Sequence, residues 1–306
     1  MNIFRERFRH KGVACIVMLG VLMTAQQSLA QSDLENILKQ ANKINVTGYA
    51  QPLADLFGAN IHSGYYHSAA ISKAGLFLRL DVIGMGSPVS DDHKTYDLTL
   101  PQSFAQRTMK APTAFGPKAT LVTDPQTGFQ YKPSDGVIDA SMFPLAVPQL
   151  TIGNVFGTQA VVRFIATPTL KGNSFPKSTL WGAGIRHSIS QYFENPAIDI
   201  AVSGFYSQYT MGDIIDLNGY SAGAQVSKDL SPLVIYGGAA WEKSTMNIAY
   251  TPEGAGNPAV DVDLEGDNTF RFTAGAALEI GPLKFFTDAN FGAVTAFSGG
   301  LGLGTW

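Results

Sequence analysis

Apolar and polar residues alternate with a period of two along much of this sequence. In the stretch "STLWGAGIRHSISQY" (178–192), Trp181 and Ile185 belong to a mostly apolar set, whereas Gly182 and Arg186 belong to a small or polar set. A period of two is typical of an extended strand with two different faces. The same alternation predicts further strands around 76–82, 159–164, 197–210, 216–228, 268–280 and 282–292.

The polar face of these strands decides between two β architectures. A soluble sandwich exposes mainly Lys, Glu and Thr on that face, whereas here it consists of Gly, Ala and Ser with a few charges of both signs. Charged residues make up only 15% of the chain, against about 25% in typical soluble proteins. Small residues suit a confined interior, and only a closed barrel satisfies every backbone group of strands that cross lipid. We therefore predict an all-β fold, a transmembrane antiparallel β-barrel whose apolar face contacts lipid.

The connections between the predicted strands support this fold, because they alternate between short and long, as in barrels with short periplasmic turns. The tight connections are 154–156, 194–197, 229–232 and 281–282, and the longer ones include 101–147, 168–177 and 252–267. Additional strands near 57–67, 74–84, 93–100 and 148–153 bring the predicted number to 12, and a count of 10–14 would also fit. The barrel would then span 57–306, with both chain ends on the periplasmic side.

The N-terminus has the pattern of a secretory signal peptide. Four basic residues precede the apolar run 12–23, and the small residues Ser28 and Ala30 mark a cleavage site before Gln31. The apolar run is too short to cross a membrane as a helix. The pattern predicts that residues 1–30 are removed on export and that the mature chain resides in the bacterial outer membrane. Because the only cysteine, Cys15, lies in the leader, the mature chain has no disulfide and no thiol site.

The charge of the mature chain argues against a nucleic-acid partner. The leader holds four of the 21 Lys and Arg and one of the 24 Asp and Glu, which leaves 17 basic and 23 acidic residues and a net charge of −6. Nucleic-acid binding requires a basic face. The partners we expect are instead outer-membrane lipid and, through a C-terminal strand that ends in the aromatic Trp306, the barrel-assembly machinery. Nothing in the sequence indicates a cofactor.

Two segments lie outside the strand pattern. Residues 31–56 form the first: 32–43 places four apolar side chains on one helical face, and 51–57 could add another turn. We interpret this region as a short periplasmic helix or a plug inserted in the lumen, with a flexible leader to the first strand as the alternative. The second segment, the proline-rich 101–147, is too long for an ordinary loop and should fold over the barrel mouth or enter it.

The sequence carries candidates for a polar lumen but none for catalysis. Charged residues on the predicted inner face could pair across it, so we expect these residues to line the lumen: Arg79, Asp81, Arg163, Arg186, Asp199, Arg271, Glu279, Lys284 and Asp288. H-E-x-x-H and phosphate-cradling glycine loops are absent. His62 and His67 would leave opposite faces of one strand, and His187 fits an interfacial position. We predict that the chain is not an enzyme, with an outer-membrane protease or acyl-transfer enzyme as the minor alternative.

Two further groups of side chains suggest surface roles. Asp261, Asp263, Glu265 and Asp267 could offer oxygen ligands to Ca²⁺, although the EF-hand pattern fails and a solvated acidic outer loop is the favoured interpretation. Aromatic residues near the strand ends could form membrane-interface girdles, with Tyr236 alternatively in the lumen; they are Trp181, Tyr206, Tyr209, Tyr220, Tyr236 and Trp241.

A resemblance to a known family rests on three stretches: "LFGANIHSGYYHSAAISKAGLFLRLDVIGM" (56–85), "GTQAVVRFIATP" (157–168) and "LWGAGIRHSISQYF" (180–193). They resemble an uncharacterised family of outer-membrane barrels from Bacteroidetes-type bacteria, similar in organisation to the long-chain fatty-acid transporter barrels. The Asn-Pro-Ala motif of those transporters occurs here only in connections, at 195–197 and 257–259, so its role is not transferred. The resemblance implies a porin-like channel or transporter for small molecules, hydrophobic ones among them; the alternative is a structural or adhesive barrel with a closed lumen.

Overall fold

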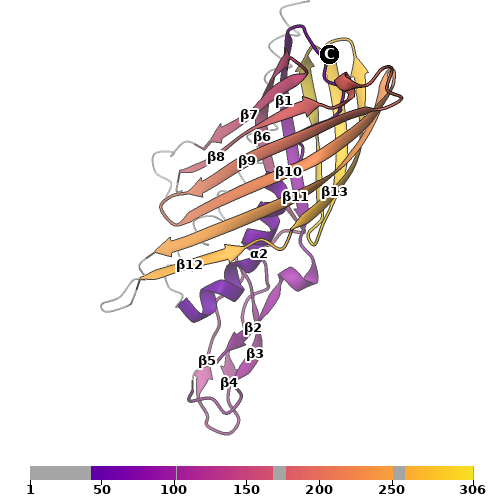
Figure 1. The fold of residues 1–306 in the computed structure, drawn as a ribbon. Helices are drawn as coiled ribbons and strands as arrows, with labels where there is room; N and C mark the ends of the chain where they lie inside the picture. Colours follow the sequence, from indigo (N-terminus) through magenta and orange to yellow (C-terminus); the bar gives the residue numbers. More distant parts are fainter. Residues whose placement is uncertain (1–42, 101, 168–176, 251–258, 306) are drawn as a thin grey trace, which may run out of the picture.

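Ten antiparallel strands close into a barrel in the computed structural model, which describes residues 43–100, 102–167, 177–250 and 259–305 (Figure 1). Each strand pairs with its neighbours in the sheet, and the first pairs with the last, which closes the barrel. Around the barrel the strands are β1 (Phe77–Pro88), β6 (Met142–Val155), β7 (Thr158–Ala166), β8 (Ser178–Ser188), β9 (Asp199–Met211), β10 (Ile215–Leu230), β11 (Leu233–Tyr250), β13 (Phe270–Ile280), β14 (Leu283–Phe291) and β15 (Ala296–Gly304).

One mouth of the barrel carries the long connections and the other carries the tight turns. At the long-connection mouth, β12 (Val260–Glu265) pairs with the end of β11 beyond the closed part of the barrel. The connection from β1 to β6 folds into a short helical turn, η1, and two small two-stranded sheets that project from the same mouth in Figure 1. Their elements are η1 (Asp91–His93), β2 (Thr95–Thr99), β3 (Thr108–Pro112), β4 (Val122–Thr123) and β5 (Gln130–Tyr131). The short helix η2 (Ser190–Tyr192) lies at the tight-turn mouth.

The outer face of the barrel is apolar over the height of a membrane. On β13 every outward residue from Phe270 to Ile280 is apolar. Ten residues at about 3.3 Å each, tilted by about 40°, rise about 25 Å, the height of the apolar band of membrane barrels. This face confirms the predicted antiparallel transmembrane barrel.

An aromatic girdle lies at the long-connection end of that apolar band. Trp181 and Tyr206 have ring centroids 5.0 Å apart, and Tyr206 lies 4.9 Å from Tyr220. Tyr209 and Tyr236, the other two tyrosines considered for the girdle, are buried inside the barrel. Among the described helices, none is long and apolar enough to cross a membrane.

The barrel has ten strands, which lies within the predicted range of 10–14 but below the preferred count of 12, because two predicted strands lie outside the barrel wall. Residues 93–100 contain β2, which pairs with β3 and places Leu98 in a separate small core. Residues 57–67 comprise the end of the helix α2 (Lys43–Ile61) and the start of the irregular chain that follows it. The predicted boundary at residue 57 therefore falls inside a helix, and the first barrel strand begins at Phe77.

The helix α2 and residues 62–76 pass through the lumen from one mouth to the other. Gly58 of the helix lies against Ser244, Tyr65 is hydrogen-bonded to Ser207 in mid-barrel, and the carbonyl of Lys73 accepts a 3.1 Å hydrogen bond at the tight turn between β6 and β7. We call residues 43–76 the plug. This position agrees with the plug interpretation of the N-terminal region, although residues 31–42, like the leader and Trp306, lie outside the described residues. As a result, Lys43 and the end of β15 lie at opposite mouths. The N-terminal end of the chain, which the sequence predicted on the periplasmic side, lies outside the described residues.

The helix α2 is apolar on nearly all sides because the barrel surrounds it. Val46, Leu53, Phe57 and Ile61 are buried among apolar side chains of the wall. A helix that is hydrophobic all round is stable only when it is enclosed. The lumen around α2, near the long-connection mouth, is therefore an apolar core, whereas the lumen beside residues 62–76 is polar.

Candidate functional site

Arginines of the barrel wall hold the plug where α2 ends. The last carbonyls of a helix have no partner within the helix, and its C-terminus carries a partial negative charge that favours nearby cations. The last turn of α2 contains no basic residue of its own. The wall supplies the missing donors, because Arg271 reaches the carbonyl of Ala59 and Arg163 reaches that of Ile61.

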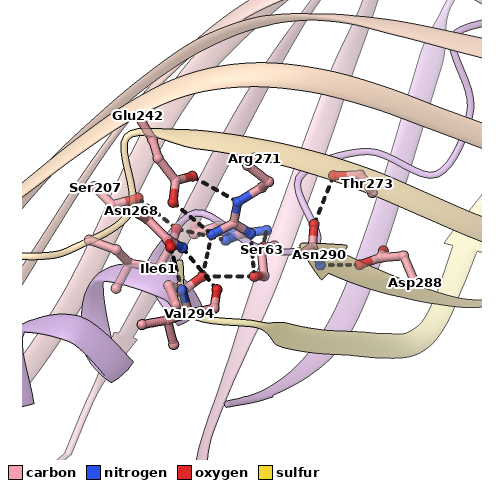
Figure 2. Close-up of polar contacts among 12 residues, drawn as sticks. Ile61, Ser63, Ser207, Glu242, Asn268, Arg271, Thr273, Asp288, Asn290 and Val294 are labelled. Carbon is pink, nitrogen blue, oxygen red and sulfur yellow. Dashed lines mark hydrogen bonds and ion pairs between the residues drawn. The ribbon is translucent and has the colours of Figure 1, made fainter. Parts of the chain in front are cut away.

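Arg271, on β13, joins three elements (Figure 2). Its Nε donates to Oε2 of Glu242 on β11 at 2.7 Å, and its Nη2 donates to the carbonyl of Ala59 at 2.6 Å. Nη1 donates to Oγ of Ser63 at 2.6 Å. The guanidinium is therefore neutralised by a carboxylate of the wall while it binds the plug at two points.

Arg163, on β7, binds the same part of the plug from the other side. Its Nη2 donates to the carbonyl of Ser63 at 2.7 Å, and its Nε donates to Oε1 of Gln149 at 2.7 Å. The guanidinium also lies 3.5 Å from the centre of the Tyr65 ring, which itself stacks on Phe205 at 4.0 Å. A cation over an aromatic face is attracted by the ring, and the attraction grows when water is excluded.

Closer to the tight-turn mouth, Arg186 on β8 donates to the carbonyl of Ser68 and to the side-chain oxygens of Gln159 and Gln225. His67 stacks on Phe286 with 3.5 Å between ring centroids. Arg271, Arg163 and Arg186 of the wall therefore contact the plug in succession, from the end of α2 toward the tight-turn mouth.

The space left between plug and wall is small. A cavity beside His62 and Tyr66, also lined by Gln225, Glu242 and Asp288, offers about 20 Å³ to the centre of a water molecule. That volume accommodates about one water molecule. This cavity therefore offers no room beside the plug for a solute larger than water.

The structure places the nine predicted lumen residues in two groups. Asp199 and Glu279 are half-buried, and Glu279 accepts a 2.7 Å ion pair from Lys284. The other seven are buried inside the barrel: Arg79, Asp81, Arg163, Arg186, Arg271, Lys284 and Asp288. Arg79 pairs with Asp81 at 2.9 Å, and Asp288 accepts hydrogen bonds from Tyr236, Asn290 and Ser298.

The predicted lumen residues did not include Glu242 or the three glutamines that orient the arginines. Glu242 could have been found, because it follows the outward Trp241 on β11 and must therefore face inward. The plug carbonyls that the arginines bind carry no side-chain signal at all.

The acidic residues considered for Ca²⁺ are engaged with other side chains. Asp261 and Asp263 both accept hydrogen bonds from Nδ2 of Asn247, and Glu265 pairs with Lys243 at 2.7 Å. Across the described residues, no group of three or more His, Cys, Asp or Glu side chains could hold a metal ion.

The fourth acidic residue, Asp267, meets the plug at the long-connection mouth. Its backbone N–H donates to Asp55 on α2 at 3.2 Å, and Gln51 donates to the same carboxyl at 2.9 Å. Burial raises the pKa of Asp55 to about 6, and the Asp267 carboxylate adds to this rise, while the bond from Gln51 opposes it.

His187 lies at the tight-turn end of β8, half-buried between Thr158 and Tyr192, which contact its two ring nitrogens at 2.8 and 2.9 Å. This is the strand-end position that the sequence predicted for an interfacial ring.

Comparison with known proteins gives one family and several solved barrels. A family model described as "Family of unknown function (DUF6588)" matches residues 9–305. No curated protein matches the sequence. The Pseudomonas putida toluene transporter TodX is similar at 13% identity and a TM-score of 0.28, over 86% of this chain and 77% of TodX. A Pseudomonas aeruginosa FadL homologue gives 9% and 0.25, over 87% and 98% of the two chains. The transport unit of the Escherichia coli autotransporter AIDA-I gives 12% and 0.29, over 87% and 100%.

Proposed function

Because this chain belongs to a family of unknown function (DUF6588), its role has to be argued from its own geometry, and we propose that it is an outer-membrane transport barrel whose lumen is closed at rest by the plug. The apolar outer face, the aromatic girdle and the signal-peptide pattern of the sequence support the location. The substrates we expect are small molecules. The single observation that carries the transport role is the polar, charge-lined contact between the plug and the wall.

Burying charges is costly, and a closed interior is often more stable when apolar side chains replace a buried ion pair. Here eight charged side chains of the wall are buried inside the barrel. Several buried polar atoms of the wall have no hydrogen-bond partner within the described residues, among them Arg79 Nη2, Asp81 Oδ1 and Gln225 Nε2. A wall that keeps such groups is suited to a second state in which water and solute replace the plug.

A second candidate function, a closed structural or adhesive barrel, is favoured by the apolar packing of α2, the helical half of the plug. Val46, Leu53, Leu56, Phe57 and Ile61 of α2 are at most 7% exposed. At about 1.5–3 kcal/mol for each buried side chain, they stabilise the docked helix by about 7–15 kcal/mol. On this hypothesis the barrel would anchor the small sheets β2–β3 and β4–β5 at the membrane surface and would never open.

Conductance in planar bilayers separates the two functions. We expect the full mature chain to conduct rarely and a variant that lacks residues 31–50 to conduct more often. The deletion removes the apolar contacts of the first half of α2, which help to hold the rest of the plug in the lumen, and it leaves the wall intact. Gly58→Cys with Ser244→Cys supplies the control: a Cβ at Gly58 would lie 3.1 Å from that of Ser244, so a disulfide can tie the plug to the wall after a small shift. Oxidation should abolish the rare openings and reduction should restore them. No conductance from folded protein in any variant would exclude the transport role.

A further inference from the structure

Five cationic side chains face the lumen beside residues 62–76, but only some of them have a carboxylate as a direct partner. Three of the five pair with carboxylates: Arg79 with Asp81 at 2.9 Å, Arg271 with Glu242 at 2.7 Å, and Lys284 with Glu279 at 2.7 Å. Arg163 and Arg186 have no carboxylate at ion-pair distance within the described chain, although they are only 1% and 2% exposed.

Neutral oxygens surround these two guanidinium groups instead. Arg163 binds Gln149 and the carbonyls of Ile61 and Ser63. Arg186 binds Gln159, Gln225 and the carbonyl of Ser68. The three glutamines are at most 2% exposed, so each is a buried neutral amide at a position where a glutamate would complete an ion pair.

This arrangement orients the two arginines without a carboxylate in direct contact with either guanidinium. An ionised group buried in a medium of low dielectric is expensive unless an opposite charge accompanies it. The planar guanidinium presents a fork of N–H donors that matches the two oxygens of a carboxylate or phosphate. In Arg163 the two Nη atoms donate to two plug carbonyl oxygens, those of Ile61 at 3.4 Å and Ser63 at 2.7 Å.

Two observations beside the arginines also point to a ligand. Both ring nitrogens of the fully buried His67 and Nε2 of Gln225 have no hydrogen-bond partner within the described residues. The part of the plug that covers them, residues 62–76, contains no helix or strand. Releasing residues 62–76 from the wall breaks no hydrogen bonds of a helix or a sheet, while α2 keeps its apolar packing near the long-connection mouth.

On the basis of the proposed transport function, we propose that Arg163 and Arg186 are two successive binding sites for a small oxyanion solute, a carboxylate or phosphate, which displaces the carbonyl of Ser63 from Arg163 and that of Ser68 from Arg186. The oxyanion supplies the missing negative charge, and the glutamines keep the guanidinium groups in place. The site opens toward the tight-turn mouth, since residues 62–76 lead there and α2 blocks the other side.

Isothermal titration calorimetry of the folded mature chain in detergent micelles tests the site, with inorganic phosphate and with acetate as probes at constant ionic strength. We expect saturable binding of at least one probe by the wild type. Gln225→Glu and Gln149→Glu, which place a carboxylate beside an intact arginine, should weaken binding at least tenfold and raise Tm. Arg107→Gln, at an exposed position outside the barrel, should bind like the wild type.

Two results would overturn the site: no saturable heat from the wild type with either probe, or undiminished affinity in Gln225→Glu. The wild-type titration decides the matter even if a variant fails to fold. Binding in micelles does not require conduction, so the two proposals can fail separately. Conductance of the variant lacking 31–50 without oxyanion binding would leave the transport role and remove the site, whereas binding without conductance would do the reverse.

Discussion

Nη2 of Arg271 in the barrel wall lies 2.6 Å from the carbonyl oxygen of Ala59, in the last turn of the helix that fills the lumen. The same guanidinium pairs with Glu242. One side chain therefore caps the plug helix and balances a buried carboxylate.

Arg271→Gln tests this double role. The variant leaves Glu242 buried without its partner, which typically costs about 3–5 kcal/mol. We expect chemical unfolding in micelles to show that loss. Lys94→Gln, which removes an exposed ion pair with Asp91, should change the unfolding free energy by less than about 1 kcal/mol. Equal effects of the two substitutions would contradict the double role of Arg271.

The contacts between the wall arginines and the plug also show how far the sequence could predict this structure. Arg163, Arg186 and Arg271 were assigned to the inner face because each strand separates lipid from lumen, and two different surroundings impose a strict period of two. The plug groups that these arginines bind could not be found in the same way. They include the backbone carbonyls of Ala59, Ile61 and Ser63, in a segment that the sequence assigned to a strand over 57–67.

The reason for that wrong strand is physical. A helix reveals itself through a period of 3.6 only when one side faces water or another polar medium. Around Phe57 and Ile61 all sides of α2 meet protein, so no such period is left. Residues 93–100 misled for a related reason: they alternate because β2 covers its own small core outside the barrel wall.

Inward and outward glycines of the wall should respond differently to the same substitution. A Cβ on Gly182 would lie 2.5 Å from the Tyr65 hydroxyl of the plug, whereas a Cβ on Gly204 would find its nearest atom 3.9 Å away. Overpacking costs about 1–3 kcal/mol, so Gly182→Ala should destabilise the barrel by that amount. Gly204→Ala should be neutral or stabilise it by up to about 1 kcal/mol. Thermal unfolding of both variants in one detergent checks the contrast, and a destabilised Gly204→Ala would contradict it.

Depth in the membrane should control the cost of a charge on the outer face. Ala274 lies near the middle of the apolar band on β13, and Ile280 lies at its tight-turn edge. Arginine at the midplane of a barrel costs about 2–4 kcal/mol and near the interface about 0–1 kcal/mol. We therefore expect Ala274→Arg to lower the unfolding free energy in lipid vesicles far more than Ile280→Arg. Similar losses would argue that this face does not contact hydrocarbon.

The burial of Asp55 beside Asp267 predicts a dependence of stability on pH. With a folded pKa of about 6 against about 3.9 in an unfolded chain, Asp55 retains a proton in the folded state that the unfolded chain releases. Stability should therefore fall as pH rises from about 4 to about 6, and then stay level, with a loss of at most about 3 kcal/mol. Asp55→Asn keeps the oxygen that accepts from Gln51 and cannot ionise. It should be more stable than the wild type at pH 8, with the difference vanishing near pH 4.

Unfolding free energies of the wild type, Asp55→Asn and the exposed control Asp139→Asn at pH 4, 6 and 8 measure this effect. The control should follow the wild type at every pH, because the Asp139 side chain is exposed to solvent at the barrel mouth. Parallel curves for the wild type and Asp55→Asn would mean that Asp55 is ionised in the folded protein. The negative charge at the mouth of the lumen would then be compatible with a docked helix, and pH would not contribute to how firmly α2 is held.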